Sequence, residues 1–184
     1  MPPRIPAKAR YIGIDPGASG GIAVVTSHQF EVTAMPRTLL HLWELISSLA
    51  GNSRAVIESV HAMPKQGVTS SFTFGRGYGG LLMALTAAKI PFEEVRPQAW
   101  QKCLGISPRK KDEPKGELKL RLLRKAQQLY PTLLLWNEPK SKGKQLAVCD
   151  ALLIATYCQR ICHGKVGVSS AREGMEALRE VWSV

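Results

Sequence analysis

The sequence predicts a single α/β domain with a mixed sheet flanked by helices. Strand-like segments come first, at 11–15, 21–26 and 28–35, with a glycine-rich turn between the first two. Helical and strand-like segments then alternate, and an apolar helical segment at 145–162 ends that series. This order is typical of a mixed sheet covered by helices. With 184 residues, 45% of them hydrophobic, the chain can bury one such core and is too short for two full domains.

Local patterns predict the remaining elements. Apolar residues at 39, 42, 43, 46 and 49 form a helical stripe. The first ten residues carry three prolines and three basic groups, so we expect a flexible basic arm at 1–10 and the folded domain at 11–184. We also expect strands at 54–58 and 92–95, helices at 39–49, 70–89, 97–104, 117–130 and 173–182, and basic loops at 105–116, which should be mobile, and 136–144.

The composition is strongly basic. Lysine and arginine number 25 against 14 aspartate and glutamate residues, which gives a formal charge of +11. Such an excess is expected of a protein that contacts nucleic acid, because phosphate contacts and counterion release supply most of the sequence-independent affinity; a solvated basic surface is the alternative. No apolar run reaches the ~20 residues that cross a bilayer, and the N-terminus lacks the apolar core of a signal peptide. We therefore expect a protein with no membrane part, located in the cytoplasm, with its four cysteines reduced.

Three carboxylates stand at positions that are costly for a charge. Asp15 and Glu58 each end a hydrophobic run, and Asp150 opens another. Burying an ionised carboxylate is unfavourable unless a cation meets it. If the three converge, they form an oxygen-lined site for Mg²⁺ or Mn²⁺, hard cations that favour carboxylate and water as ligands. Two such ions about 4 Å apart can hydrolyse a phosphodiester, with Asp15 bridging them and Glu58 and Asp150 holding one each.

Each acid also has an ordinary structural explanation. Asp15 precedes Pro16 and Gly17 and could be a turn residue. Glu58 could pair with Arg54, although the β period makes that pairing awkward. Asp150 could be an ordinary acid near a helix start.

Four segments of the chain together resemble the RuvC family of Holliday junction resolvases. They read IGIDPGASGGIA at 12–23, VIESVHAMPKQG at 56–67, FGRGYG at 74–79 and DALLIA at 150–155. Their order and spacing, from about residue 11 to residue 160, are most similar to the phage and prophage branch and also resemble the plant chloroplast resolvases.

The resemblance implies both a fold and an activity. The fold is ribonuclease H-like, and the protein would act as a homodimer in DNA recombination and repair. It would cut two strands of a four-way DNA junction symmetrically, using one or two Mg²⁺ or Mn²⁺ ions per active site. Asp15, Glu58 and Asp150 would be the metal-binding and catalytic residues.

The chain departs from this family at one ligand. RuvC-type sites usually carry an Asp or His three residues before the last acid, and this position holds Ala147. Leu146, the other residue on that helical face, is no substitute. Either three carboxylates, water and phosphate hold the second ion, or another acid such as Glu117 moves in, so the number of ions stays open.

The expected DNA contacts lie in and around the same segments. Phe72 or Phe74 would stack on an unpaired base at the junction centre, an interaction worth roughly 1–3 kcal/mol per base; both could instead belong to a helix core.

Four glycines between 75 and 80 weaken a helix and suggest close approach of DNA or of a second subunit. Lys115 or Lys119 could steady the charge on the scissile phosphate, and we assign that catalytic role to Lys115. The predicted DNA-binding residues are Lys65, Gln66, Phe72, Phe74, Arg76, Tyr78, Lys110, Lys111, Lys119, Lys142 and Lys144.

The sequence therefore predicts a metal-dependent, structure-selective endodeoxyribonuclease, and two other functions compete with it. A non-catalytic junction-binding protein of the same fold would explain Ala147, whereas the three acids argue against it. The glycine-rich turn after Asp15 also resembles the first phosphate loop of actin-like kinases and ATPases. Those proteins need a second such domain, for which 184 residues leave no room.

Overall fold

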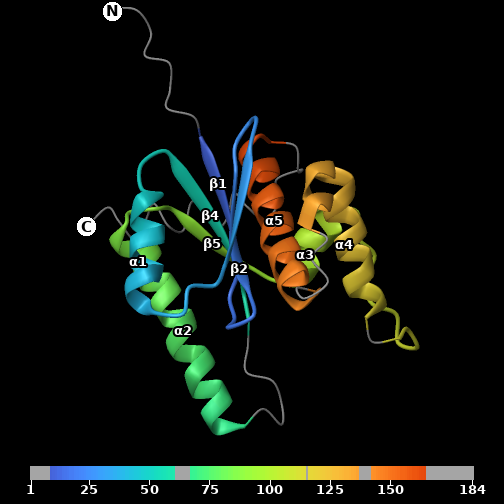
Figure 1. Cartoon of the computed structure of the whole chain (residues 1–184), viewed down its shortest axis with the longest axis horizontal. Coiled ribbons are helices and arrows are strands. Elements are labelled where there is room, and N and C mark those ends of the chain that lie inside the picture. The colour runs from blue at the N-terminus through green and yellow to red at the C-terminus, as the bar shows by residue number, and fades with distance from the viewer. Residues whose placement is uncertain (1–8, 61–66, 115, 137–141, 165–184) are drawn as a thin grey trace, which may run out of the picture.

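Five strands form one mixed sheet with helices on both of its faces (Figure 1). The computed structural model describes residues 9–60, 67–114, 116–136 and 142–164. β1 pairs antiparallel with β2, and β2 with β3, whereas β4 runs parallel to β1 and β5 parallel to β4. This arrangement confirms the predicted single-domain α/β fold. Across the sheet the order is β3 (Phe30–Ala34), β2 (Gly21–Val25), β1 (Arg10–Asp15), β4 (Ser53–Glu58) and β5 (Phe92–Val95).

The helices form two layers. α1 (Leu39–Ser48) and α2 (Val68–Ala87) cover one face of the sheet, where their apolar residues pack on Ile12 and Ile14. None of the described helices is both long and apolar enough to span a membrane. The other face carries α3 (Pro97–Cys103), α4 (Glu117–Leu129), the 3₁₀ helix η1 (Pro131–Trp136) and α5 (Lys142–Cys162).

The register between β1 and β4 brings two of the predicted site residues together. These parallel strands pair Gly13 with Val56 and Ile14 with Ile57, so the next position places Asp15 beside Glu58. Because successive side chains of a strand point to opposite faces, Asp15 and Glu58 share the face of Val56. That face is the one covered by α5, since Val56 belongs to the same buried cluster as Leu152 and Ile154.

Gly13 allows α5 to lie directly on β1. A methyl group on Gly13 would be 2.7 Å from Ala155 Cα, and closer still to Ala155 N and Ala151 O. Any residue other than glycine would therefore push the helix away from the sheet. Asp150 immediately precedes Ala151, so this contact also fixes how far Asp150 lies from the end of β1.

Several boundaries differ from those expected from the sequence. β1 begins at Arg10, inside the predicted arm, because the Arg10 amide donates to Asn52 O and its guanidinium donates to Ala50 O. α5 begins at Lys142, three residues before the expected start. The loop at 105–116 was expected to be mobile, yet its described residues carry a network of side-chain hydrogen bonds. Residues 1–8 and the expected helix at 173–182 lie outside the described residues.

A substitution at Gly13 tests the contact with α5. We expect Gly13→Ala to lower the free energy of unfolding by 1–3 kcal/mol or more, since overpacking displaces backbone rather than a flexible side chain. Gly17→Ala is the matched control, because a methyl group there meets only Gly20 N at 3.9 Å. Chemical denaturation followed by circular dichroism measures both variants. Equal stability of the two would contradict the close packing.

Candidate active site

Three acids meet at the end of the sheet where β1 and β4 finish. Asp15 is the last residue of β1, Glu58 is the last residue of β4, and Asp150 lies on α5 above them. The negative charge of Asp15 raises the pKa of both Glu58 and Asp150, and Glu58 also raises the pKa of Asp150. The structure thus places together the three carboxylates that the sequence singled out.

Burial is the main cause of the shifted acidities. Loss of solvation raises the pKa of Asp15 to about 6, that of Glu58 to about 7 and that of Asp150 to about 8. The ion pairs formed among the described residues involve other acids, namely Glu93, Glu113 and Glu117. The site therefore brings together three acids with which no described cation forms an ion pair.

Trp100 orients Glu58, a role that the sequence did not reveal. The indole Nε1–H of Trp100, on α3, donates to Glu58 Oε2 at 2.9 Å. This hydrogen bond lowers the pKa of Glu58 and partly opposes the effect of burial. Trp100 is only 1% exposed, so its ring also holds α3 in the core. A buried tryptophan usually finds an acceptor for its N–H, so the tryptophan itself was the sequence signal that could have suggested such a contact.

Lys119 supplies positive charge near the cluster. It lies in the first turns of α4, and its ammonium group lowers the pKa of Asp15 and of Asp150. Lys119 is therefore the described lysine whose charge reaches the acids. Lys115, to which we assigned the catalytic role, lies outside the described residues, so that assignment stays a prediction.

The chemistry of the three acids fits a hard divalent cation. Buried carboxylates that raise one another's pKa need positive charge, and carboxylate oxygens are the ligands that Mg²⁺ and Mn²⁺ prefer. Their side chains do not form a ready ligand set: within the described ranges, no three His, Cys, Asp or Glu side chains are grouped closely enough to hold a metal ion.

Arg54 and Glu117, which the sequence offered as a partner of Glu58 and as a replacement ligand, each form an ion pair with another residue. Arg54 pairs with Glu93 at 3.9 Å and not with Glu58. Glu117, the acid suggested as a replacement ligand, faces Arg124 at 3.7 Å in an exposed ion pair.

The predicted DNA contacts on α2 differ in exposure. Phe72 is 72% exposed, and Arg76 is exposed as well. Phe74 instead stacks on Tyr78 with ring centroids 6.0 Å apart, and the Tyr78 hydroxyl donates to Glu94 Oε2 at 2.6 Å. Of the two phenylalanines, Phe72 is therefore the one free to meet a base. The first half of α2 projects past the end of the sheet (Figure 1).

The predicted basic contacts are only partly described. Lys110 and Lys111 are exposed in the loop before α4, and Lys142 and Lys144 belong to the first turn of α5. Lys65 and Gln66 lie outside the described residues. All DNA contacts therefore remain predictions.

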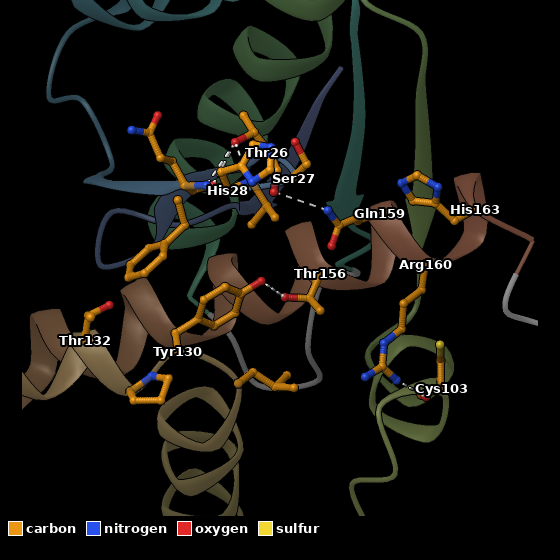
Figure 2. A pocket seen from close by; sticks show the side chains of 15 residues that line it. Thr26, Ser27, His28, Cys103, Tyr130, Thr132, Thr156, Gln159, Arg160 and His163 are labelled. Atoms are coloured by element: carbon orange, nitrogen blue, oxygen red, sulfur yellow. Dashed lines mark hydrogen bonds between the residues drawn. The ribbon is translucent and has the colours of Figure 1, made fainter. Parts of the chain in front are cut away.

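A cavity of about 920 Å³ lies at the opposite end of α5 (Figure 2). Gln159 and Arg160 line it from the last turn of α5, together with His163 just after that helix and the hairpin between β2 and β3. In the register of β1 and β2, this hairpin adjoins Tyr11, whereas Asp15 pairs with Gly21 at the other end. The cavity is thus separate from the three acids.

Neutralising Asp150 should stabilise the metal-free protein. The pKa of Asp150 rises from 3.8 to about 8 on folding, so the unfolded chain ionises first as pH rises. Ionisation of this group therefore does not reduce folding stability below pH 4. It reduces stability progressively between pH 4 and pH 8, and the reduction is constant above pH 8. We expect Asp150→Asn to raise the free energy of unfolding at pH 8 by roughly 2–4 kcal/mol, and to change it little at pH 4.

Thermal unfolding at both pH values, with EDTA, measures this difference. Asp112→Asn, at an exposed acid, is the matched control and should change stability by less than about 0.5 kcal/mol. A loss of stability at pH 8 in Asp150→Asn would refute the free-energy cost of ionising this buried carboxyl beside the other two.

Trp100→Phe tests the orientation of Glu58. Phenylalanine keeps most of the buried ring and removes the N–H donor, so Glu58 should be less fixed and its pKa higher. We expect a roughly 10- to 100-fold increase in the Mn²⁺ concentration that half-saturates the thermal stabilisation by this ion. Trp43→Phe, at a partly exposed tryptophan on α1, should leave that concentration unchanged. An unchanged Mn²⁺ requirement in Trp100→Phe would argue against the orienting role.

Comparison with known proteins shows similarity at the level of structure. No protein-family model and no curated protein matches the sequence. The solved structure of Thermus thermophilus RuvC is similar with a TM-score of 0.52 and 16% sequence identity, over 80% of this chain and 94% of that one. T. thermophilus RuvC in complex with a Holliday junction substrate gives a TM-score of 0.51 and 15% identity, over 82% and 94% of the two chains. The chain therefore has a RuvC-like, ribonuclease H-like fold.

Proposed function

We propose that this chain is a divalent-metal-dependent endodeoxyribonuclease that resolves four-way DNA junctions by hydrolysing phosphodiester bonds. The observation that carries the proposal is the meeting of Asp15, Glu58 and Asp150 at one end of a RuvC-like sheet. The four sequence segments that resemble RuvC resolvases support it, and they favour the phage and prophage branch. We expect the activity in the cytoplasm of a bacterial or phage-infected cell.

Each residue of the cluster has a part in the proposed reaction. Asp15, Glu58 and Asp150 would hold one or two Mg²⁺ or Mn²⁺ ions, which supply Lewis acidity and make water a stronger nucleophile. Trp100 keeps one oxygen of Glu58 turned in a fixed direction. Lys119 offsets negative charge on the scissile phosphate, because its ammonium group already acts on Asp15 and Asp150. We retain Lys115 as a second candidate for that role.

The exposed residues favour branched DNA as substrate. The net charge of +11 suits a polyanion, and T. thermophilus RuvC, which shares the fold, has been solved with a Holliday junction. Phe72 and Arg76 are exposed in the first half of α2. There Phe72 would stack on a base opened at the junction centre, which duplex DNA does not offer.

A homodimer is part of the proposal. Leu39 and Met83 are 60% and 63% exposed on α1 and α2, the helices of the face opposite the acids. A methyl group added at Gly75, Gly77 or Gly79 would meet nothing within 4 Å, so α2 is open to close approach at these positions. A two-fold dimer would present two active sites to a junction of matching symmetry.

The second candidate is a junction-binding protein without nuclease activity. Two observations favour it: the position expected for a fourth ligand holds Ala147, and the described side chains show no group of three acids, histidines or cysteines close enough for a metal. Both proteins would bind junctions, so cleavage separates them.

A cleavage assay tests the proposal. The protein is incubated with a labelled immobile four-way junction or matched duplex, in Mg²⁺, Mn²⁺ or EDTA. We expect paired symmetric cuts in the junction alone, with either ion, and a loss of at least about 100-fold for Asp15→Asn and Glu58→Gln. Glu44→Gln, at an exposed acid on α1, is the control and should cut normally.

The outcomes separate the candidates. Junction binding without cleavage would favour the second candidate. Equal cutting of duplex would refute the selectivity for junctions, and full activity of Asp15→Asn would refute the metal assignment.

A further inference from the structure

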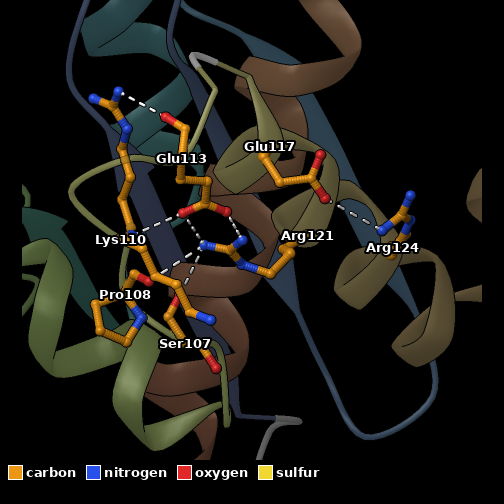
Figure 3. Close-up of polar contacts among 8 residues, drawn as sticks. Ser107, Pro108, Lys110, Glu113, Glu117, Arg121 and Arg124 are labelled. Atoms are coloured by element: carbon orange, nitrogen blue, oxygen red, sulfur yellow. Dashed lines mark hydrogen bonds and ion pairs between the residues drawn. The ribbon is translucent and has the colours of Figure 1, made fainter.

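The loop between α3 and α4 contains a partly buried ion pair between Glu113 and Arg121 of α4 (Figure 3). The loop holds four basic residues. Arg109, Lys110 and Lys111 precede Glu113, and Lys115 follows it. The Glu113 carboxylate accepts hydrogen bonds from both terminal nitrogens of Arg121, with Nη2 to Oε2 at 3.1 Å. Only 8% of the Glu113 side chain is exposed, which is unusual for an acid in so basic a segment.

The same two side chains bind the loop backbone. Glu113 Oε2 accepts from the amide of Lys110 at 2.9 Å. Arg121 Nη2 also lies within 3.3 and 3.4 Å of the carbonyl oxygens of Ser107 and Pro108, and Arg109 Nη2 donates to Glu113 O at 3.1 Å. Segment 107–113 is therefore held against α4 along its length. The hydrogen bonds lower the pKa of Glu113 to about 2, so it stays ionised at all pH values at which the protein would work.

The helices on both sides of this loop carry residues that act on the three acids. α3, before the loop, contributes Trp100, which donates to Glu58. α4, after the loop, contributes Lys119, whose charge acts on Asp15 and Asp150. Fixing the loop between these helices also fixes Lys110 and Lys111 relative to the three acids. Both lysines are exposed.

A second ion pair, between Glu117 and Arg124 of α4, is more exposed than the pair of Glu113 and Arg121. Glu117 and Arg124 lie 3.7 Å apart, with 40% and 69% of their side chains exposed. An exposed pair of this kind contributes little to order. The partly buried pair of Glu113 and Arg121 instead combines a paired fork with several contacts to the loop backbone, the arrangement that fixes geometry most strongly.

We propose that Glu113 and Arg121 are positioning residues that hold Lys110 and Lys111 as a preformed phosphate-binding turn for one duplex arm of the junction. The proposal rests on the proposed function, since it names a surface that takes the DNA backbone of the proposed substrate. Pre-ordering matters because each side chain immobilised on binding costs free energy, which a fixed loop has already lost on folding. Phosphate contacts of this kind set register and orientation without reading sequence.

The direction in which one substitution changes DNA affinity separates this positioning role from a purely electrostatic effect of Glu113. Glu113→Ala removes a negative charge from the loop, which by charge alone should tighten DNA binding. If Glu113 instead orders the loop, the same change should weaken binding to a labelled four-way junction by roughly tenfold, measured in Ca²⁺ by fluorescence anisotropy. Asp112→Ala is the matched control: it removes the same charge from the adjacent, exposed residue and should bind equally or more tightly.

Two further measurements show whether the loss comes from the lysines. Lys110→Ala with Lys111→Ala should reduce the slope of log affinity against log salt concentration by about two in the wild type, and by much less in the Glu113→Ala background. Amide hydrogen exchange at Lys110 should be faster in Glu113→Ala than in Asp112→Ala, while the melting temperatures of both confirm folding. Glu113→Gln, which keeps the side-chain volume, should be intermediate.

The outcomes distinguish the two proposals. If the wild type does not bind the junction, the proposed function fails and this inference with it. If the wild type binds but Glu113→Ala binds as tightly as Asp112→Ala, or exchanges no faster at Lys110, only the positioning role is refuted.

Discussion

The contact between α5 and Gly13 determines where everything else in the site can lie. Glycine at this position lets the helix backbone rest on β1, with Ala151 and Ala155 directly above the strand. Asp150 is carried on the same helix turn, and Asp15 follows Gly13 by two residues on the same face. β4 adds Glu58 through its register with β1. One residue without a side chain therefore lets three carboxylates from distant parts of the sequence share a small, poorly solvated space.

Ionising all three acids in that space is energetically unfavourable. Burial raises their pKa values to between about 6 and 8, the acids add to one another's shifts, and Lys119 offsets only part of the effect on Asp15 and Asp150. The surrounding packing must supply the free energy that holds them there. Trp100 illustrates this: the same ring is a large buried side chain and the donor that holds Glu58. Sites that bind highly charged partners commonly store such strain, since it favours the bound state over the free one.

The fold and the acids could be predicted from the sequence because their signals are local. Each strand shows its own alternation, and each of Asp15, Glu58 and Asp150 interrupts an apolar run. Contacts between distant residues gave no such signal. Trp100 lies 42 residues from Glu58, and nothing in a linear pattern specifies that pair. The loop before α4 was expected to be mobile from its charge and prolines, whereas its described residues are held by Glu113 and Arg121. The sequence does show two adjacent acids, Asp112 and Glu113, within a basic segment, but it does not show which of them pairs with Arg121.

The register of β1 and β4 has a consequence for how related chains can differ in length. Side chains along a strand alternate between faces, so adding or deleting one residue between Gly13 and Asp15 would carry that carboxylate to the α1 and α2 side of the sheet. The same holds between Val56 and Glu58. Substitutions at Ile14 or Ile57 change only the packing beneath α1 and α2. Homologous chains should therefore vary freely in length at the hairpin 26–29, at the far end of the sheet, while the spacing of glycine and acid in β1 stays constant.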